Sequence, residues 1–140
     1  MNAASLVVDA SVLAKLFLAE ADSTHADRSV RSVRSLFGPE LLAVEVAAAI
    51  VRRFRMRGAN RAETEASLAQ ARTFFTHGGI ALAPDIDLLP RAELIAMELT
   101  HPLQDCLYLA LAERLGCDLV TADATLLARA APQFPFVKAL

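Results

Sequence analysis

The sequence contains few cysteines, few aromatic residues and little lysine, and it lacks several well-known motifs. Its two cysteines, Cys106 and Cys117, form neither a C-x-x-C pair nor a disulfide framework of the secreted type, so we expect a reducing, cytoplasmic location. No His/Cys spacing is typical of a zinc site. The Gly-rich phosphate loop, the G-x-S-x-G elbow and the dinucleotide fingerprint are also missing. These absences argue against zinc enzymes, P-loop enzymes, serine hydrolases and dinucleotide-dependent enzymes.

Long uncharged apolar runs are also missing, which predicts a protein without a membrane span. The N-terminus has no basic region and Asp9 interrupts its apolar run, so we expect no signal peptide. A chain of 140 residues, 55% of them hydrophobic, predicts a single domain (residues 1–140) with a substantial core. The net charge of −2 excludes a global attraction to nucleic acid, so any such binding requires a local basic patch.

The order of apolar runs and helical patterns predicts an α/β fold. We expect strands at residues 6–8, 80–83, 119–121 and 134–137. Helices are expected at residues 11–19, 39–57, 61–76, 88–100 and 102–116. A further helix is expected to begin at the capping residues 22–24, and a short one follows residue 123. Strands separated by helices pair in parallel through right-handed crossovers. The predicted fold is therefore a three-layer α/β/α sandwich with a central parallel sheet of four to five strands.

Two acidic residues follow short apolar runs where strands are expected to end. Asp9 follows Leu6-Val7-Val8, and Asp123 lies two residues after Leu119-Val120-Thr121. Continuous apolar runs suit strands buried on both faces, and open α/β sheets bind ligands at the carboxyl ends of their strands. The alternative for each aspartate is an N-cap of the helix that follows, and the sequence favours neither.

Two further acids lie within expected helices. Glu45 is the only charged residue in an apolar run of ten residues, 41–50. A buried isolated carboxylate costs on the order of several kcal/mol, so Glu45 needs a cation, a partner or a metal, unless it reaches solvent or a nearby arginine. Asp105 lies in the first turn of the helix that Pro102 opens, where the helix dipole alone gives it about 0.3–1 kcal/mol.

Taken together, the four acids predict a metal site. Asp9, Glu45, Asp105 and Asp123 would meet at one edge of the sheet, where like charges repel unless something neutralises them. All-oxygen ligands suit Mg²⁺ or Mn²⁺. Carboxylates that hold these ions support phosphoryl chemistry, in which the metal activates a water molecule and stabilises charge on a phosphodiester.

Arginines form two groups that could contact phosphates, although an ordinary solvated helix face explains them more simply, because arginines at helix ends also satisfy the dipole. The first group is predicted to share one helix face and consists of Arg28, Arg31 and Arg34. The second group lies at the end of the helix that contains Glu45 and consists of Arg52, Arg53, Arg55 and Arg57. The three histidines, His25, His77 and His101, are predicted to be surface or capping residues rather than catalytic bases, and only His101 is close in sequence to one of the acids.

The segments that contain the four acids resemble the PIN-domain family and, within it, the VapC-type toxins of bacterial toxin–antitoxin pairs. The resemblance covers nearly the whole chain in order and spacing, and its motifs are residues 7–11, Glu45-Val46, 105–112 and 119–123. It implies a PIN-like fold and an Mg²⁺- or Mn²⁺-dependent endoribonuclease. Asp9 and Asp105 match the acids that usually touch the metal, and Glu45 and Asp123 match acids that act through water or a second metal.

The resemblance also implies supporting residues and partners. Ser11 and Thr121 match hydroxyls that orient the acids, and the family's toxins form homodimers that a small cognate antitoxin blocks. This chain departs from the family pattern at two positions. Ala48 replaces a common asparagine, which leaves Glu45 with less polar support, and Gln104 replaces a common aromatic residue before the third acid.

Two other functions compete with a ribonuclease. A non-catalytic PIN-like interaction module would need no acid set, so the presence of all four acids argues against it. A receiver-like signalling domain would need adjacent acids near its first strand and a lysine after a late strand. Asp9 has no acidic neighbour, and the only lysines are Lys15 and Lys138, so this alternative is weak.

Overall fold

A five-stranded, wholly parallel sheet forms the centre of the molecule. The computed structural model describes residues 4–140. The strands are β1 (Ser5–Val8), β2 (Ser35–Pro39), β3 (Ala81–Ala83), β4 (Asp118–Thr121) and β5 (Val137–Ala139). They lie in the order β3-β2-β1-β4-β5, so β1 is the middle strand. The predicted parallel sheet of four to five strands is confirmed.

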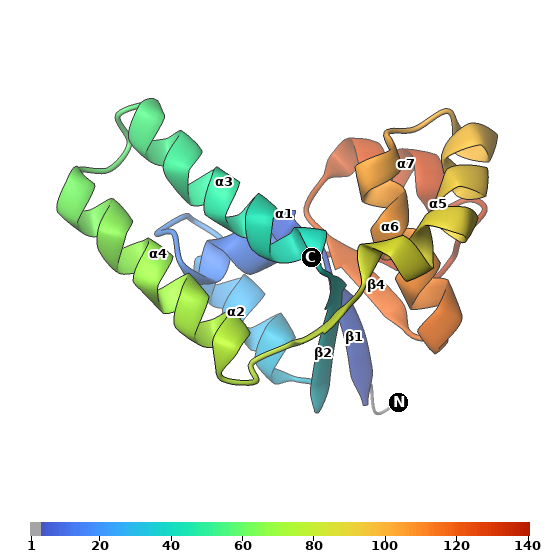
Figure 1. Ribbon diagram of the computed structural model, residues 1–140, viewed down its shortest axis with the longest axis horizontal. Helices are drawn as coiled ribbons and strands as arrows, with labels where there is room; N and C mark the ends of the chain where they lie inside the picture. The colour runs from blue at the N-terminus through green and yellow to red at the C-terminus, as the bar shows by residue number, and fades with distance from the viewer. Residues whose placement is uncertain (1–3) are drawn as a thin grey trace.

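Helices cover both faces of the sheet, as the predicted three-layer sandwich requires. They are α1 (Ala10–Leu13), the 3₁₀ turn η1 (Ala14–Leu16), α2 (Ser23–Arg31), α3 (Leu41–Arg55), α4 (Arg61–Thr76), α5 (Asp85–Leu99), α6 (Leu103–Leu115) and α7 (Ala124–Ala130). Figure 1 shows α1 to α4 on one side of β1 and β2, and α5 to α7 on the other side. Side chains from both layers and the sheet form a continuous apolar core.

The local sequence explains where the strands and helices that carry the acids begin and end. Val7, Val8 and Leu119 are fully buried, as the central strands of a parallel sheet require. Helix α6 is buried along most of its length, and it ends at Gly116, which adopts the left-handed conformation (φ 66°) that glycine tolerates best. Asp9 at the end of β1 and Asp105 in the first turn of α6 consequently lie close enough for their charges to interact.

Several predicted boundaries are wrong. Pro39 ends β2 instead of opening a helix, and β2 itself was not predicted, since its Ser35-Leu36-Phe37-Gly38-Pro39 sequence mixes apolar and turn residues. Arg34 lies beyond the end of α2, so the first arginine group does not share one helix face. Helix α5 begins three residues before the expected Leu88, and the last strand begins at Val137 rather than 134. None of these errors moves an acid away from its expected element.

Candidate active site

Asp9 lies at the carboxyl end of the middle strand, beside the end of β4. The register pairs Val8 with Val120, and the Asp9 N–H donates to the Val120 carbonyl (3.0 Å), which places Asp9 next to Thr121. The Asp9 residue is only 6% exposed. Although Asp9 precedes α1, its side chain makes no capping hydrogen bond to that helix. Asp9 therefore occupies the N-cap position of α1, but its carboxylate does not cap the helix.

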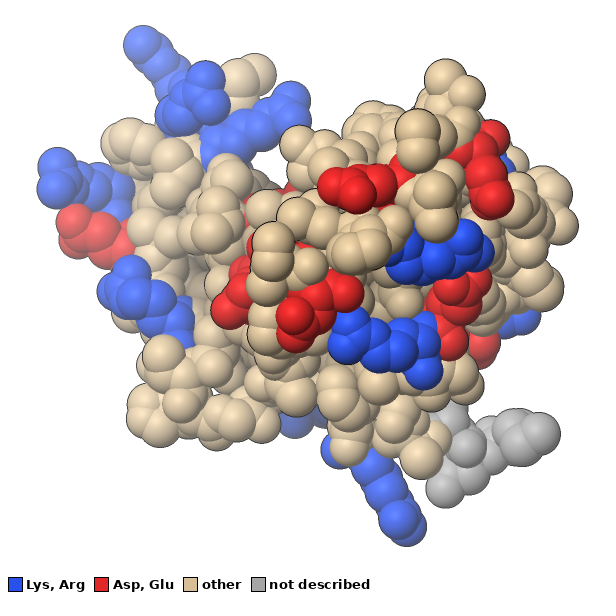
Figure 2. Space-filling view, turned by 45° about the vertical axis from the view of Figure 1, so that its right-hand side comes forward, with Lys and Arg blue, Asp and Glu red and all other residues tan. Residues whose placement is uncertain are grey.

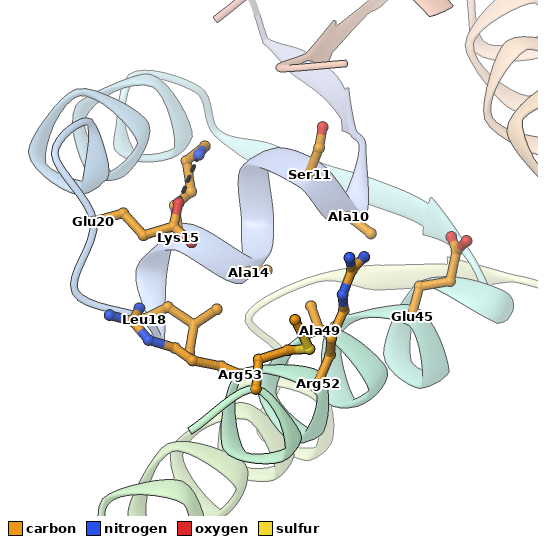
Figure 3. A pocket seen from close by; sticks show the side chains of 11 residues that line it. Ala10, Ser11, Ala14, Lys15, Leu18, Glu20, Glu45, Ala49, Arg52 and Arg53 are labelled. Atoms are coloured by element: carbon orange, nitrogen blue, oxygen red, sulfur yellow. Dashed lines mark hydrogen bonds and ion pairs between the residues drawn. The ribbon is translucent and has the colours of Figure 1, made fainter. Parts of the chain in front are cut away.

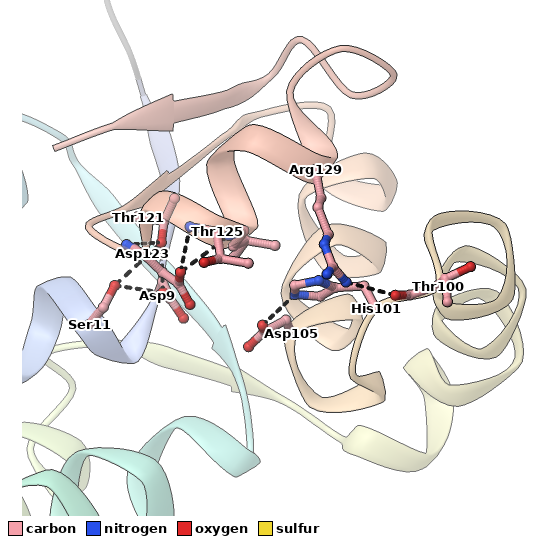
Figure 4. A network of polar contacts seen from close by, with 10 residues as sticks. Asp9, Ser11, Thr100, His101, Asp105, Thr121, Asp123, Thr125 and Arg129 are labelled. Atoms are coloured by element: carbon pink, nitrogen blue, oxygen red, sulfur yellow. Dashed lines mark hydrogen bonds and ion pairs between the residues drawn. The ribbon is translucent and has the colours of Figure 1, made fainter.

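Two hydroxyl groups hold the Asp9 carboxylate through a single oxygen. Ser11 and Thr121 both donate to Oδ2, at 2.6 and 2.8 Å. Each hydroxyl accepts a backbone N–H in turn, Ser11 from Ala122 and Thr121 from Asp123, both at 3.0 Å. Because an ionised carboxylate can only accept, both hydroxyl protons point to Asp9, while each backbone N–H takes a lone pair of one hydroxyl. Figure 4 shows this network, which leaves the other oxygen of Asp9, Oδ1, without a side-chain hydrogen bond among residues 4–140.

Glu45, on α3, is supported by a residue that the sequence analysis did not select. The hydroxyl of Tyr108, on α6, donates a short hydrogen bond to Glu45 Oε1. Tyr108 is fully buried, so its ring and hydroxyl are held in place by the core. The polar support that Ala48 cannot supply therefore comes from another helix. The helical periodicity of α6 could have indicated a buried Tyr108, but not which residue it contacts.

Asp105, in the first turn of α6, pairs with His101. The two side chains approach to 2.6 Å between His101 Nε2 and Asp105 Oδ2, and the His101 side chain is 3% exposed. The prediction that His101 is a surface or capping residue is therefore wrong. Figure 4 shows the Asp105 carboxylate extending towards the region of Asp9 and Asp123.

Asp123 is the N-cap of α7, which is the alternative that the sequence had left open for it. Its Oδ1 accepts the backbone N–H groups of Thr125 and Leu126, at 2.9 and 3.2 Å, and so caps α7. Asp9 and Asp123 both follow a buried strand, yet only Asp123 uses its carboxylate as a helix cap. The cap fixes the orientation of Asp123 beside the Thr121 hydroxyl that serves Asp9.

The first three acids form one electrostatic group. Burial raises the pKa of Asp9, against the opposing hydrogen bonds from Ser11 and Thr121, and the charge of Asp105 raises it further. Burial also raises the pKa of Glu45, with Tyr108 opposing it and the charges of Asp9, Asp105 and Asp85 adding to the increase. The carboxylates of Asp9 and Glu45 are thus harder to ionise than they would be in water, and a cation beside them would relieve that penalty.

This electrostatic penalty predicts how the stability of the metal-free protein changes with pH. A carboxyl group whose pKa is raised in the folded state binds its proton more tightly there than in the unfolded chain. The contribution of Asp9 and Glu45 to stability is therefore highest below their unfolded pKa values, near 3.8 and 4.5, and falls as the pH rises through the folded values. In EDTA, we expect the melting temperature of Asp9→Asn to exceed that of the wild type by a margin that widens from pH 4 to pH 7. A constant margin over this range would contradict the raised pKa.

The donor set suits a hard cation bound by few protein ligands. Within the described residues, no three Asp, Glu, His or Cys side chains are arranged so as to hold a metal ion on their own. Mg²⁺ differs from zinc or calcium in this respect, because one or two carboxylates and several water molecules are enough to bind it. The carboxylate oxygens Asp9 Oδ1 and Asp105 Oδ1 make no side-chain hydrogen bond among residues 4–140, so they remain available as ligands.

An open groove extends from this site along α3. The α1–α3 groove has a volume of about 610 Å³ and is lined by Ala10, Ser11, Ala14, Lys15, Leu18, Glu20, Glu45, Ala49, Arg52, Arg53 and Met56. Figure 3 shows Arg52 pointing towards the end where Ala10 and Glu45 lie, whereas Arg53 extends towards Leu18. The Arg53 guanidinium donates to the Ala19 carbonyl (3.1 Å), so Arg53 holds the wall of the groove.

The second arginine group is therefore divided by the structure. Arg55 and Arg57 line a different hollow, beside Asn60 and Glu63 at the turn between α3 and α4. Figure 2 shows basic side chains gathered at the upper left, where this helical hairpin ends, and acidic side chains concentrated nearer the centre. Of the four arginines, only Arg52 both lines the groove beside Glu45 and has no side-chain hydrogen bond or ion pair within residues 4–140.

The fold and the site together describe a parallel α/β/α sandwich with acidic side chains at the carboxyl edge of its sheet. The sequence model of the PIN domain matches residues 6–132, so the chain belongs to the PIN-domain family. The match includes all four acids.

Two proteins of Pyrobaculum aerophilum refine this placement. The chain is 36% identical over 132 residues to Ribonuclease VapC3, an alignment that covers 93% of this chain and 95% of the relative. The crystal structure of PAE2754 matches the fold with a TM-score of 0.68 and 25% identity, covering 89% of this chain and 78% of the other. These findings confirm the resemblance to the PIN-domain family and to its VapC-type members.

Proposed function

We propose that this protein is an Mg²⁺- or Mn²⁺-dependent endoribonuclease that acts in the cytoplasm as the toxin of a VapBC-type pair. The observation that most favours catalysis is the buried Asp9 carboxylate, which two oriented hydroxyls hold by one oxygen while the charges of Asp105 and Glu45 lie nearby. An arrangement that raises the pKa of carboxylates costs stability, and such costs are typical of functional sites. The name of the relative Ribonuclease VapC3 supports RNA as the substrate.

Each acid has a role in the proposed mechanism. Asp9 and Asp105 would hold the ion, and Glu45 and Asp123 would bind its water molecules or a second ion. When bound, the ion supplies a nucleophilic water and stabilises the charge that develops on the phosphodiester. Ser11 and Thr121 keep Oδ2 of Asp9 occupied and so present Oδ1. Tyr108 holds one oxygen of Glu45, which leaves the other oxygen to orient water.

The α1–α3 groove is the proposed path of the RNA backbone. It is open, begins at Glu45 and contains the guanidinium of Arg52, and a guanidinium binds phosphate oxygens through paired hydrogen bonds. Arg53 is already bound to Ala19, and Arg55 and Arg57 lie outside the groove. The candidate RNA-binding set of the sequence analysis is thus reduced to Arg52 for direct contact near the site.

Replacing Arg52 with alanine is expected to weaken RNA binding by about tenfold, since one phosphate contact with a charged partner contributes about 1.4 kcal/mol or more. The KM for a short RNA should rise while kcat changes little, and the effect should shrink at high salt. Arg55→Ala is the matched control, because it removes the same charge one turn further along α3. Equal effects of the two variants would show that the groove does not guide the substrate.

A cleavage assay on total cellular RNA tests the proposed activity. We expect discrete cleavage products with Mg²⁺ or Mn²⁺ and none in EDTA. A purified protein that binds Mn²⁺ but cuts no RNA would favour the alternative, a non-catalytic PIN-like interaction module. The weaker receiver-like alternative would require uptake of phosphate from a small phosphodonor on Asp9, which the same preparation can test.

The proposed assembly includes a second copy of the chain and a small antitoxin. Large apolar side chains are strongly exposed on α5 and around the end of α3, including Met56 (71%), Ile86 (71%) and Met97 (70%). Exposed apolar surface of this kind is typical of interfaces, so we expect a homodimer. Light scattering that shows a monomer across micromolar concentrations would contradict this expectation. None of the helices within residues 4–140 is long and apolar enough to cross a membrane.

A further inference from the structure

The turn before α6 holds a histidine whose ring, among the described residues, hydrogen-bonds to one group, an acid of the proposed site. His101 Nε2 lies 2.6 Å from Asp105 Oδ2, and the other ring nitrogen, Nδ1, is buried without a partner among residues 4–140. A buried ring N–H without an acceptor is unfavourable, so Nδ1 is left unprotonated and the single ring proton belongs on Nε2. The Nε2–H then donates to Asp105.

The backbone of this turn is strained at Thr100, the residue that precedes His101. Thr100 adopts the left-handed conformation (φ 50°, ψ 54°), which a β-branched residue rarely occupies. Strain of this kind persists only where the surrounding structure imposes it, and it is concentrated at functional sites. Here the restraint comes from α7, since Arg129 donates to the Thr100 carbonyl at 2.8 Å. The His101 N–H also closes the end of α5 by donating to the Ala96 carbonyl.

We propose that His101 is a positioning residue for Asp105. The histidine occupies Oδ2 and so turns Oδ1 towards the acids at the sheet edge, as Ser11 and Thr121 do for Asp9. Groups that hydrogen-bond a ligating carboxylate usually change metal affinity or activity by about 10–100-fold when they are removed. The inference rests on the proposed function, because it assigns His101 a role in presenting Asp105 to the ion.

Two substitutions separate positioning from simple packing. His101→Leu fills a similar volume without a donor, whereas His101→Gln keeps an N–H that can reach Asp105. In the presence of Mn²⁺, we expect the leucine variant to lose about 10–100-fold in kcat and to bind Mn²⁺ more weakly in calorimetry. The glutamine variant should recover most of both properties. Equal impairment of the two variants, or wild-type behaviour of the leucine variant, would overturn the proposal.

A measurement on the metal-free protein makes the test independent of RNA cleavage. Nitrogen NMR of the imidazole should show His101 with a proton on Nε2 and none on Nδ1. Asp105→Asn should shift the Nε2 resonance, and His25 and His77 serve as internal controls because neither contacts Asp105. A ring protonated on Nδ1, or an Nε2 resonance that does not move in Asp105→Asn, would refute the hydrogen bond between His101 and Asp105. If the wild type cut no RNA, the proposed function would fail, while the NMR and Mn²⁺ affinities would still decide the role of His101.

Discussion

Asp9→Asn is expected to abolish RNA cleavage and, in the same protein, to raise the melting temperature in EDTA. Removing a metal-ligating charge takes away several kcal/mol of transition-state stabilisation, so activity should fall by more than about 100-fold. Packing should scarcely change, because the amide oxygen of asparagine can still accept from Ser11 and Thr121. The burial that raises the pKa of Asp9 no longer opposes folding when the side chain is neutral.

The gain in stability should amount to a few degrees, since about 1 kcal/mol corresponds to roughly 4 °C for a domain of this size. Added Mg²⁺ should raise the melting temperature of the wild type more than that of the variant, because ligands stabilise the state that binds them. Asp118→Asn is the matched control: this acid begins β4, at the opposite end of the strand, and is exposed. Cleavage by Asp9→Asn at the wild-type rate would show that Asp9 is not a metal ligand.

The strand-end acids could be predicted because strand burial and chain order are local properties of the sequence. Three apolar residues before Asp9 indicate a buried central strand, and a parallel sheet brings the ends of such strands to one edge. The roles of Asp9 and Asp123 could not be distinguished in this way. Their difference depends on whether a helix N-terminus or two hydroxyls lie nearest the carboxylate, which is decided by tertiary structure.

Two of the supporting residues, Tyr108 and His101, were missed for the same reason, whereas the hydroxyls of Ser11 and Thr121 were predicted. Tyr108 has the sequence signature of a core residue, and it becomes functional only because α6 packs where Glu45 of α3 can reach it, 63 positions away in the chain. His101 lies four residues before Asp105, a spacing visible in the sequence. Its burial, however, depends on the left-handed Thr100 and on Arg129, neither of which the sequence marks. Strand β2 escaped prediction because Gly38 and Pro39 resemble a turn.

Glu45→Gln should reduce RNA cleavage by about 100-fold, an effect second only to that of Asp9→Asn. Glutamine has the shape of glutamate and can still accept the Tyr108 hydrogen bond, so the fold should remain intact. The loss of a carboxylate whose pKa burial has raised should also make the metal-free protein slightly more stable. Glu93→Gln is the control, because Glu93 is exposed on α5 and makes no side-chain hydrogen bond within residues 4–140.

Tyr108→Phe shows whether the hydroxyl acts through Glu45. Phenylalanine keeps the buried ring, and only the donor to Glu45 is lost, so we expect about a tenfold fall in kcat because a hydrogen bond to a charged group contributes about 1.5–3 kcal/mol. If the hydroxyl orients Glu45, the double variant Tyr108→Phe/Glu45→Gln should be no less active than Glu45→Gln alone. The effects of substituting residues that act as a unit do not add. If the fall in kcat of the double variant equals the product of the two single falls, Tyr108 supports the core around α6 and Glu45 does not depend on it.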